Sequence, residues 1–370
     1  MTNKSLVIHP GFHKSGTTAL QESFAANRDR LAELGIFYPS VGGKAHHRVA
    51  WALTQRPWGW NKRGGERTPE KVWDRMVSRI AGASDQTALL SSEFFSEIDG
   101  EKIRKIRSDI KNRDVKVLFT LRPLAKLLPS SYQQYLKYGI TNEYEDWLHA
   151  ILDKPGESKV SPTFWKRHSH GKVIARWVDT FGASNVTILI VNEAQPSFLF
   201  DEINKYLSLE PGTLAPENSG SNRSLTMEEI ALLLELNRKF PKERVWDEYE
   251  TFIRAGYIRE LTDHVPPAPD KARLLTPDWA ITKANQLGME IKEEIKSLGV
   301  KVVGDIDSLG SAQVPIGSSS YPTTIDINTV AAAMLAFDKE TIQKFPLDWL
   351  QRDLYRRYRK RLVQRLKRLK

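Results

Sequence analysis

The sequence predicts an α/β fold, in which a parallel β-sheet is flanked by helices and followed by a helical C-terminal half. Short apolar runs rich in strand-forming residues alternate with longer mixed segments along the first 190 residues, and this alternation is typical of βαβ units. Each run is continuously apolar, as expected for strands that helices cover on both faces. A chain of 370 residues, 40% of them hydrophobic, can build a large core.

The predicted elements follow from these runs. Four strands are expected at residues 5–9, 87–91, 115–121 and 186–191. The segments between and after them predict helices at residues 18–34, 70–81, 102–111, 130–138, 172–180, 227–240 and 281–298. This order predicts a parallel sheet of about four or five strands.

The composition excludes several classes of protein. The chain has no cysteine, which rules out disulfides, thiolate zinc sites, iron–sulfur clusters and cysteine nucleophiles. No apolar run reaches the ~18 residues of a transmembrane helix, and the apolar run near the N-terminus is too short for a signal peptide. We therefore expect a cytoplasmic protein, either soluble or peripheral on the inner face of a membrane.

The net charge of +10 is concentrated at the C-terminus. From Arg352 to Lys370 there are ten Lys/Arg and one acid, which leaves 45 basic and 44 acidic residues in the preceding chain. After Pro346, apolar residues recur at steps of three and four, which predicts a basic amphipathic helix over residues 346–370. Such a helix is typical of anionic membrane surfaces, although packing on its own domain or on a second subunit explains the same pattern. Because the body is nearly neutral and lacks a nucleic-acid-binding motif, we expect no nucleic-acid partner.

The clearest chemical motif follows the first strand: Gly11-Phe12-His13-Lys14-Ser15-Gly16-Thr17-Thr18. A strand, a Gly-containing loop and then a helix form a phosphate site, because backbone N–H groups and the helix N-terminus converge on one anion. The spacing of Gly11 and Gly16 matches a Walker A loop. However, Thr17 stands where the Walker lysine should follow Gly16, and the lysine of this loop is Lys14 instead.

The motif Lys14-Ser15-Gly16-Thr17-Thr18, within the stretch HPGFHKSGTTALQESFAANRDRLAELGIFYPS, resembles the 5′-phosphosulfate-binding loop of sulfotransferases. These enzymes use 3′-phosphoadenosine 5′-phosphosulfate (PAPS) as the sulfuryl donor. The resemblance implies the P-loop-like sulfotransferase fold and a donor-binding loop from His13 to Thr18. It implies that Lys14 contacts the bridging oxygen and stabilises the departing phosphate, while Ser15 to Thr18 bind the 5′-phosphate. It is strong over residues 5–40 and 85–140 and does not extend beyond residue 310.

A second feature of the family is an arginine at a strand end and a serine eight residues later, which together hold the 3′-phosphate. Arg122 follows the third predicted strand, and Ser130 lies eight residues further on. A guanidinium offers a fork of donors that fits a phosphate. Because proline disrupts a regular helix, we expect the helix around Ser130 to start or kink at Pro129. Arg223 resembles a basic residue with which other sulfotransferases close over the nucleotide.

Sulfuryl transfer to a hydroxyl needs a base that accepts the proton as the oxygen attacks sulfur. Glu93 follows the second predicted strand, and the carboxyl ends of parallel strands border one crevice, so we expect Glu93 to face the phosphate loop and Arg122. The family places a His or a Glu at this strand end, which identifies Glu93 as the candidate base. His46 or His47 is the alternative base, and Ser92 is a candidate for binding the acceptor or the donor.

The acceptor class is suggested by a tryptophan-rich insertion. Residues 48–73 hold four tryptophans among arginines and lysines: Trp51, Trp58, Trp60 and Trp73. Indole rings stack on sugars and cations, so the insertion fits an anionic glycan acceptor, although core packing of two or more of these rings explains them equally well. A glycan, a lipid-linked glycan and a small alcohol all stay open as acceptors, and we expect a glycan or a glycolipid. No metal is expected, because Lys14 and the loop supply the positive field that Mg²⁺ supplies in kinases. His168 and His170 are expected at the surface.

Two other functions compete with this interpretation. A P-loop kinase or NTPase shares the strand–loop–helix unit, but the chain lacks the Walker lysine and no predicted strand ends in an aspartate suited to Mg²⁺. A non-catalytic nucleotide- or glycan-binding protein has no need of a base such as Glu93. We expect a sulfotransferase-like domain at residues 1–310 (nucleotide-binding core 1–210, helical part 211–310), a linker and helix at 311–345, and the tail helix at 346–370.

Overall fold

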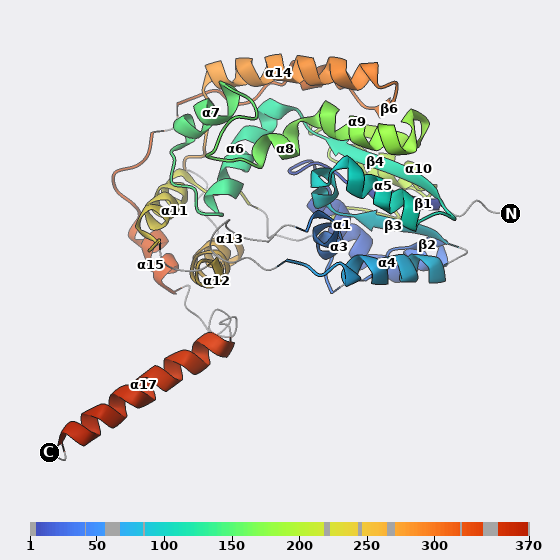
Figure 1. The fold of residues 1–370 in the computed structure, drawn as a ribbon. Helices are drawn as coiled ribbons and strands as arrows, with labels where there is room; N and C mark the ends of the chain where they lie inside the picture. Colours follow the sequence, from blue (N-terminus) through green and yellow to red (C-terminus); the bar gives the residue numbers. More distant parts are fainter. Residues whose placement is uncertain are drawn as a thin grey trace.

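The computed structural model describes residues 5–40, 42–55, 67–83, 86–217, 223–242, 246–264, 271–318, 320–335 and 347–368. The described residues form a six-stranded, fully parallel sheet with the strand order β2-β3-β1-β4-β5-β6 (Figure 1). The strands are β1 (Ser5–His9), β2 (Ile36–Phe37), β3 (Thr87–Ser91), β4 (Asp114–Leu121), β5 (Val186–Ile190) and β6 (Lys301–Val303).

The topology of the sheet defines one preferred place for a ligand. β1 lies between β3 and β4, with Val7 opposite both Leu89 and Lys116. The chain therefore builds β2 and β3 on one side of β1, and β4, β5 and β6 on the other. In open α/β sheets, the crevice beyond the carboxyl ends of the strands opens at such a switch of direction, so the end of β1 is where a ligand site is expected.

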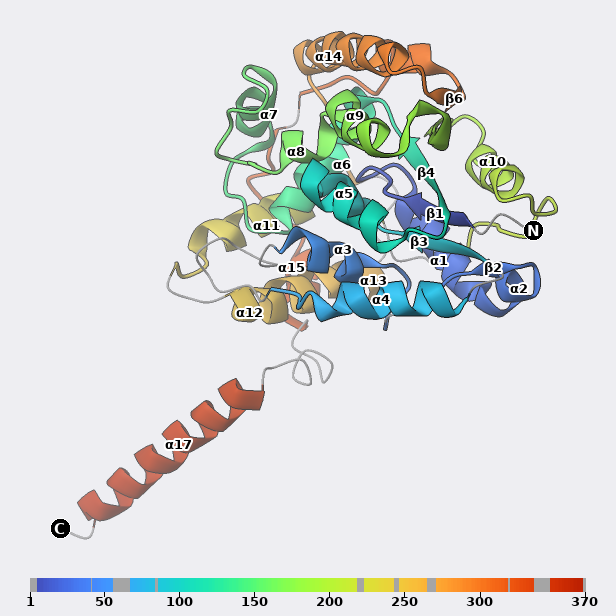
Figure 2. The same cartoon turned by 45° about the vertical axis from the view of Figure 1, so that its right-hand side comes forward.

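Helices cover both faces of the sheet (Figures 1 and 2). One face packs against α3 (His47–Thr54), α4 (Lys71–Gly82), α5 (Gly100–Asp109), α9 (His170–Phe181) and the second half of α14 (Asp278–Ser297). The other face packs against α1 (Thr17–Ala26), α2 (Arg28–Glu33) and α10 (Phe198–Tyr206). Strand residues alternate between these two layers: Leu6 and Ile8 belong to the first hydrophobic cluster, and Val7 to the second.

A third hydrophobic cluster joins helices from distant parts of the chain. It contains residues of α6 (Leu124–Leu136), α7 (Tyr144–Leu152), α8 (Phe164–His168), α11 (Met227–Lys239), α12 (Trp246–Tyr249), a π-helix (Glu250–Ile258), α13 (Arg259–His264) and the first half of α14, with α15 (Ile327–Leu335) against it. A capping box, in which Thr226 and Glu229 satisfy each other's backbone, fixes the start of α11. The division of the chain at residues 210 and 310 remains a prediction.

The strand predictions are confirmed to within one residue at each end, but the sheet has two more strands than the four runs indicated. β2 and β6 have only two and three residues, too few for a hydrophobic run to reveal. The helix expected at 18–34 is two helices, α1 and α2, which meet at Asn27. The expectation that a helix starts or kinks at Pro129 was wrong about the start: α6 begins at Leu124 and contains Pro129. Burial of Leu127, Leu128 and Tyr132 on either side of the proline holds this helix together.

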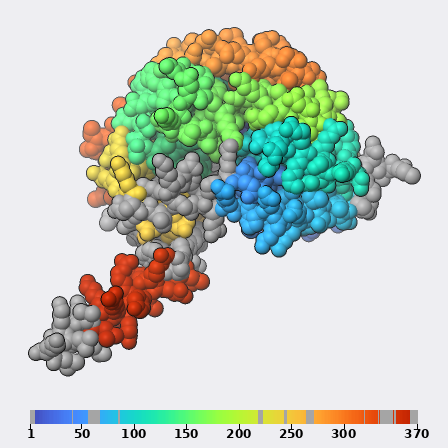
Figure 3. Space-filling model, in the orientation of Figure 1, coloured from blue at the N-terminus to red at the C-terminus, as the bar shows by residue number. Residues whose placement is uncertain are grey.

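The C-terminal segment lies apart from the body. α17 (Leu347–Arg368) projects away from the sheet and its helices in both ribbon views, and the space-filling view shows the same separation (Figures 1, 2 and 3). The helix expected at residues 346–370 is thus present over the residues that the structure describes there. No helix in the described part of the chain is both long enough and apolar enough to cross a bilayer.

Candidate functional site

The carboxyl ends of four strands carry polar residues, and the sequence singled out those that follow β1, β3 and β4. The phosphate loop follows β1, Glu93 follows β3, Arg122 follows β4 and Glu193 follows β5. Two of these strands lead into helices, α1 and α6, whose N-termini therefore point at the same edge of the sheet. Helix N-termini carry partial positive charge, so this edge favours an anionic ligand.

The loop between β1 and α1 has a backbone shaped to receive an anion. Gly11, Lys14 and Gly16 have left-handed φ angles of 48°, 67° and 85°. A Cβ at Gly11 would overlap Thr17 and one at Gly16 would overlap Leu199, so both positions require glycine. No side chain caps the N-terminus of α1, which leaves the N–H groups of its first turn available to a ligand.

A chain of buried hydrogen bonds holds this loop on the sheet. The ring of His9, at the end of β1, bonds Ser91 Oγ at 2.8 Å and Thr120 Oγ1 at 3.2 Å. Thr120 Oγ1 bonds Ser15 Oγ at 2.8 Å, and Ser15 Oγ donates to the carbonyl of Phe12 at 2.7 Å. The hydroxyl of Ser15 therefore shapes the loop, whereas the side chain of Thr18, in the first turn of α1, is exposed.

The side chain of Lys14 reaches from the phosphate loop to α6. Its ammonium donates to Gln134 Oε1 of α6 at 3.2 Å. Desolvation by the surrounding protein lowers the pKa of Lys14, the negative charge of Glu93 opposes that shift, and the positive charge of Arg122 adds to it. Glu93 and Arg122 are thus both near enough to Lys14 to change its pKa.

Glu93 is held as a carboxylate. Its Oε2 accepts a hydrogen bond from Gln21 Nε2 at 3.1 Å and lies 3.8 Å from His47 Nδ1. Burial opposes ionisation, but His47, His13 and the bond from Gln21 outweigh it and keep the pKa of Glu93 below its usual value. An ionised carboxylate beside the loop is available to accept a proton at neutral pH, although a lowered pKa makes it a weaker base.

The other candidates near Glu93 have different environments. Both ring nitrogens of His46 are used by the backbone, with Nε2 at 2.7 Å from the carbonyl of Pro39 and Nδ1 at 3.0 Å from the N–H of Ser91. Burial lowers the pKa of His46 to about 4, so its ring is neutral and structural. Ser92 is fully buried, and its Oγ lies 2.9 Å from His47 Nδ1. Of the two histidines, His47 is therefore the one beside Glu93.

Arg122 and Lys126 share one carboxylate. The guanidinium of Arg122 forms an ion pair with Glu193, and Lys126 Nζ lies 3.0 Å from the other oxygen of the same carboxylate. Arg122 Nε is buried and has no hydrogen-bond partner among the described residues. Ser130, one helical turn after Lys126, donates its hydroxyl to the carbonyl of Leu127 at 3.0 Å. These groups supply more positive than negative charge at the start of α6.

A buried network lies beneath the phosphate loop. Glu97 accepts from Arg167 Nε at 2.8 Å and lies 3.2 Å from His13 Nε2, and these partners hold the pKa of Glu97 at about 2 against the effect of burial. His13 therefore supports the loop from inside. The surface placement expected for His168 and His170 was wrong: both are buried, because their rings pack in a row with His13, Phe12 and Phe164.

The remaining candidates lie around this site. Arg223 makes a bidentate ion pair with Glu229 at 2.7 and 2.8 Å, at the start of α11. Trp73 is a core residue, whereas Trp51 packs on His47 and Phe94. Trp58 and Trp60 lie outside the described residues. A cavity of about 360 Å³ is lined by residues of α1 and α3, among them Thr18, Gln21, His47 and Trp51. Two of these residues, Gln21 and His47, are the neighbours of Glu93 described above.

Several residues of the site carried no motif in the sequence. Gln134, Lys126 and Glu193 are examples, and their roles depend on contacts between segments that are far apart along the chain. A periodic pattern could have revealed two of these three residues, Lys126 and Gln134. Together with Ser130 they recur every four residues, so they must share a face of any helix. The described residues contain no group of three or more His, Cys, Asp or Glu placed to hold a metal ion.

Comparisons with known proteins give a limited result. No protein-family model and no curated protein matches the chain. Among solved structures, the chain is similar to a sulfotransferase from Alicyclobacillus acidocaldarius, with 15% sequence identity over 64% of this chain and 93% of that chain, and a TM-score of 0.41. At this identity and TM-score, the likeness assigns neither a family nor an activity to this chain.

Proposed function

We propose that the protein is a sulfotransferase that moves a sulfuryl group from PAPS to a hydroxyl of an acceptor, which we take to be a glycan or glycolipid. The observation that carries this proposal is the mutual placement of Lys14, Glu93 and Arg122 at the carboxyl edge of the sheet. One anion-binding loop, one ionised carboxylate and one arginine with an unpartnered donor are what sulfuryl transfer between a nucleotide and a hydroxyl requires.

Each residue has a separate role in the proposed reaction. The loop from His13 to Thr18 holds the 5′-phosphate with backbone N–H groups, and Arg122 with Ser130 and Lys126 holds the 3′-phosphate. Glu93 accepts the proton of the acceptor hydroxyl while its oxygen forms a bond to sulfur. As the bond between sulfur and the bridging oxygen breaks, Lys14 stabilises the negative charge that develops on the phosphate. The products are the sulfated acceptor and 3′-phosphoadenosine 5′-phosphate (PAP).

The positive charge of the site supports a reaction without a metal ion. Lys14, the N-terminus of α1 and Arg122 already surround the position proposed for the phosphates. Of the alternatives, a kinase is less favoured, because Thr17 stands in place of the Walker lysine. A binding protein without activity is less favoured, because it gains nothing from an ionised Glu93 beside the loop.

Isothermal titration calorimetry distinguishes these functions. We expect PAP to bind in the presence of EDTA. We also expect its affinity to exceed that of AMP by a factor of about ten or more, because a charged hydrogen bond to the extra phosphate contributes about 1.5–3 kcal/mol. ATP with Mg²⁺ is the control ligand for the kinase alternative. Equal affinities for PAP and AMP, or a clear preference for ATP with Mg²⁺, contradict the proposal.

A further inference from the structure

Lys137 is a cation near the proposed reaction centre to which the mechanism above gives no role. It occupies the C-cap position of α6, directly after the last residue of that helix. It lies three residues after Gln134, the hydrogen-bond partner of Lys14. Its side chain is partly buried, and within the described part of the chain its ammonium has no hydrogen bond or ion pair. Partial burial of a lysine without an acidic partner disfavours its charged form, which points to a ligand that supplies the missing negative charge.

Several charged groups are near enough to Lys137 to change its pKa. Lys14 from the phosphate loop, Arg254 from the π-helix and Arg223 from the segment before α11 lower it, whereas Glu229 of α11 raises it. Glu229 is already committed to Arg223, and Arg254 is paired with Glu250 and stacked over Tyr138 at 4.4 Å. Both carboxylates therefore neutralise arginines and leave the charge of Lys137 uncompensated.

One face of α6 connects this position with the rest of the site. Lys126, Ser130, Gln134 and Lys137 follow one another at steps of four, four and three residues, and so lie along one side of the helix. With a rise of about 1.5 Å per residue, Lys137 lies roughly 5 Å beyond Gln134 along the axis, and Lys126 roughly 12 Å before it. The order along the helix is thus the Arg122 end, then Lys14, then Lys137.

We propose that Lys137 forms a third anion subsite that takes a sulfonate or carboxylate group next to the two phosphate positions. The inference rests on the proposed function and adds to it. Such a group has two sources: the sulfuryl group of the donor itself, or an acidic group on the acceptor. In either case, the side chain of Lys137 acts by direct contact with a substrate.

The titration of Lys137 supplies an independent readout. Burial, together with Lys14, Arg254 and Arg223, lowers the pKa of Lys137 to about 8, while Glu229 opposes this shift. The ammonium, which is the form that binds an anion, is therefore lost as the pH rises through about 8. Anion binding at this subsite should weaken from pH 7 to pH 9.5 in the wild type, and should not weaken in Lys137→Arg, because a guanidinium stays charged.

Calorimetry on the wild type, Lys137→Met and Lys137→Arg tests the subsite, with Lys172→Met, an exposed lysine of α9, as the matched control. If the sulfuryl group is the ligand, Lys137→Met binds PAPS about tenfold more weakly than the wild type and binds PAP unchanged. If the acceptor supplies the anion, the PAP-loaded wild type prefers p-nitrophenyl β-D-glucuronide to p-nitrophenyl β-D-glucoside, and Lys137→Met loses that preference. Lys137→Arg restores binding in either case.

The outcomes separate this inference from the proposed function. If the wild type binds no PAP, the proposed function fails, and the subsite fails with it. If the wild type binds PAP, but Lys137→Met matches it with PAPS, PAP and both glycosides, the subsite alone is overturned. An equal loss of PAP and PAPS affinity in Lys137→Met also overturns it, because the residue would then act on the nucleotide or on the fold.

A second inference comes from α17, which is independent of the active site. Its apolar residues stand at steps of three and four, and those with described side chains are exposed: Leu347 (76%), Leu350 (37%), Leu354 (70%), Tyr358 (65%) and Leu362 (42%). Such large apolar side chains are rarely left open to water in a row, so we expect this stripe to bind a partner other than the described part of the chain. The net charge of +9 after Gln351 makes that partner acidic.

We infer that α17 binds the surface of a membrane rich in anionic lipids. A membrane supplies both an acidic surface and an apolar layer beneath it, whereas an acidic polymer supplies only the charge. The arginines and lysines that interrupt the apolar stripe can extend their head groups to the lipid phosphates while their stems lie in the interface. If this holds, the enzyme works beside lipid-linked acceptors.

Vesicle flotation tests this binding with the full chain. We expect the wild type to float with vesicles of phosphatidylcholine and 40% phosphatidylglycerol, and to be released in 1 M salt, since each cation adds about fivefold to the affinity. The variant Arg356→Glu/Arg359→Glu/Lys360→Glu should not float. A matched control with the same change of charge on α4 and α5, Lys71→Glu/Arg75→Glu/Arg104→Glu, should float as the wild type does. The inference is overturned if the wild type does not float or if it floats equally with pure phosphatidylcholine. It is also overturned if the protein is retained only on RNA, or if it forms a dimer that persists without vesicles.

Discussion

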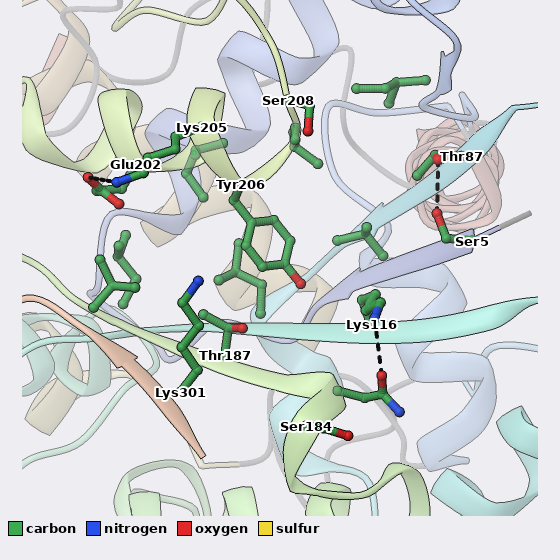
Figure 4. Close-up of a pocket in the computed structure, with 18 of the residues that line it drawn as sticks. Ser5, Thr87, Lys116, Ser184, Thr187, Glu202, Lys205, Tyr206, Ser208 and Lys301 are labelled. Atoms are coloured by element: carbon green, nitrogen blue, oxygen red, sulfur yellow. Dashed lines mark hydrogen bonds and ion pairs between the residues drawn. The ribbon is translucent and has the colours of Figure 1, made fainter. Parts of the chain in front are cut away.

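The two edges of the sheet carry cavities of very different character. At the amino edge, the first residues of several strands and the inner side of α10 border a cavity of about 690 Å³, almost twice the volume of the one beside Glu93 (Figure 4). Its polar groups largely satisfy one another: Ser5 bonds Thr87 at 2.9 Å, Lys116 bonds Asn185 at 3.3 Å, and Lys205 pairs with Glu202 at 3.6 Å. Lys301 is exposed.

The carboxyl edge has the smaller cavity, but it holds the polar groups that lack hydrogen-bond partners among the described residues. Arg122 Nε is buried without a partner in the described chain, the first turn of α1 has no side-chain cap, and Lys14 holds a left-handed backbone. The difference follows from the polarity of βα units, because each crossover directs a helix N-terminus to this edge. The proposed site therefore follows the distribution of unpaired donors among the described residues and not the volume of the cavities.

The largest expected effect at the carboxyl edge is on turnover. Glu93→Gln keeps the shape of the side chain but removes the base, so turnover should fall about 100-fold or more, with PAP affinity little changed. Lys14→Ala should reduce both turnover and affinity, because the proposed mechanism has the ammonium contact the phosphate before and during the reaction. PAP release with a sulfated product, measured by chromatography, reports turnover.

The alternative base provides the control for that experiment. His47 lies 2.9 Å from Ser92 Oγ and 3.8 Å from Glu93 Oε2, so His47→Gln changes the partner of the carboxylate without removing it. Turnover like that of the wild type in Glu93→Gln, together with a loss of about 100-fold in His47→Gln, would transfer the role of base to His47.

The next effect concerns nucleotide binding at the start of α6. Arg122→Ala removes the charged donor that we assign to the 3′-phosphate, so PAP affinity should fall by a factor of about ten or more, and AMP affinity by much less. Calorimetry with both nucleotides measures the difference. An equal loss for PAP and AMP would place Arg122 away from the 3′-phosphate and weaken the assignment of this edge.

Much of the fold was predictable, because long buried strands produce continuous apolar runs. β1, β3, β4 and β5 are each recognisable in this way, whereas β2 and β6 owe their conformation to neighbours in the sheet. The path of α6 through Pro129 was not predictable from local rules. Tertiary packing on both sides of the proline outweighs the hydrogen bond that it cannot make.

The site divides in a similar way. Lys14, Glu93 and Arg122 follow strand ends, and topology alone brings strand ends together, so the sequence could place them in one crevice. Which histidine lies beside Glu93 could not be predicted from the adjacent pair His46 and His47, because the backbone partners of His46 come from other segments. Glu193 and Lys137 had no motif, and only the fold brings them to the site.

A smaller effect is expected from Glu193, the carboxylate that Arg122 and Lys126 share. A phosphate bound to these cations must compete with it, so Glu193→Gln should bind PAP about two- to fivefold more tightly, since a partly exposed ion pair contributes up to about 1 kcal/mol. Calorimetry at low and high salt measures this gain, which should shrink as salt screens the pair. Weaker PAP binding in Glu193→Gln would instead make this carboxylate a ligand contact.

The smallest effect on PAP affinity is expected from substitutions at the amino edge. These substitutions test whether the nucleotide site lies at the carboxyl edge and not at the edge with the larger cavity. Lys116→Ala and Lys301→Ala remove two cations beside the larger cavity but leave the helix N-termini at the other edge untouched. Because ~10 Å of salt solution screens exposed charges, and the length of a strand separates the two edges, PAP affinity should change by less than about twofold. Lys116 also bonds Asn185, so thermal unfolding should accompany the calorimetry to detect any loss of stability. A loss of PAP affinity in Lys301→Ala as large as in Arg122→Ala, with unchanged thermal stability, would move the nucleotide site to the edge with the larger cavity.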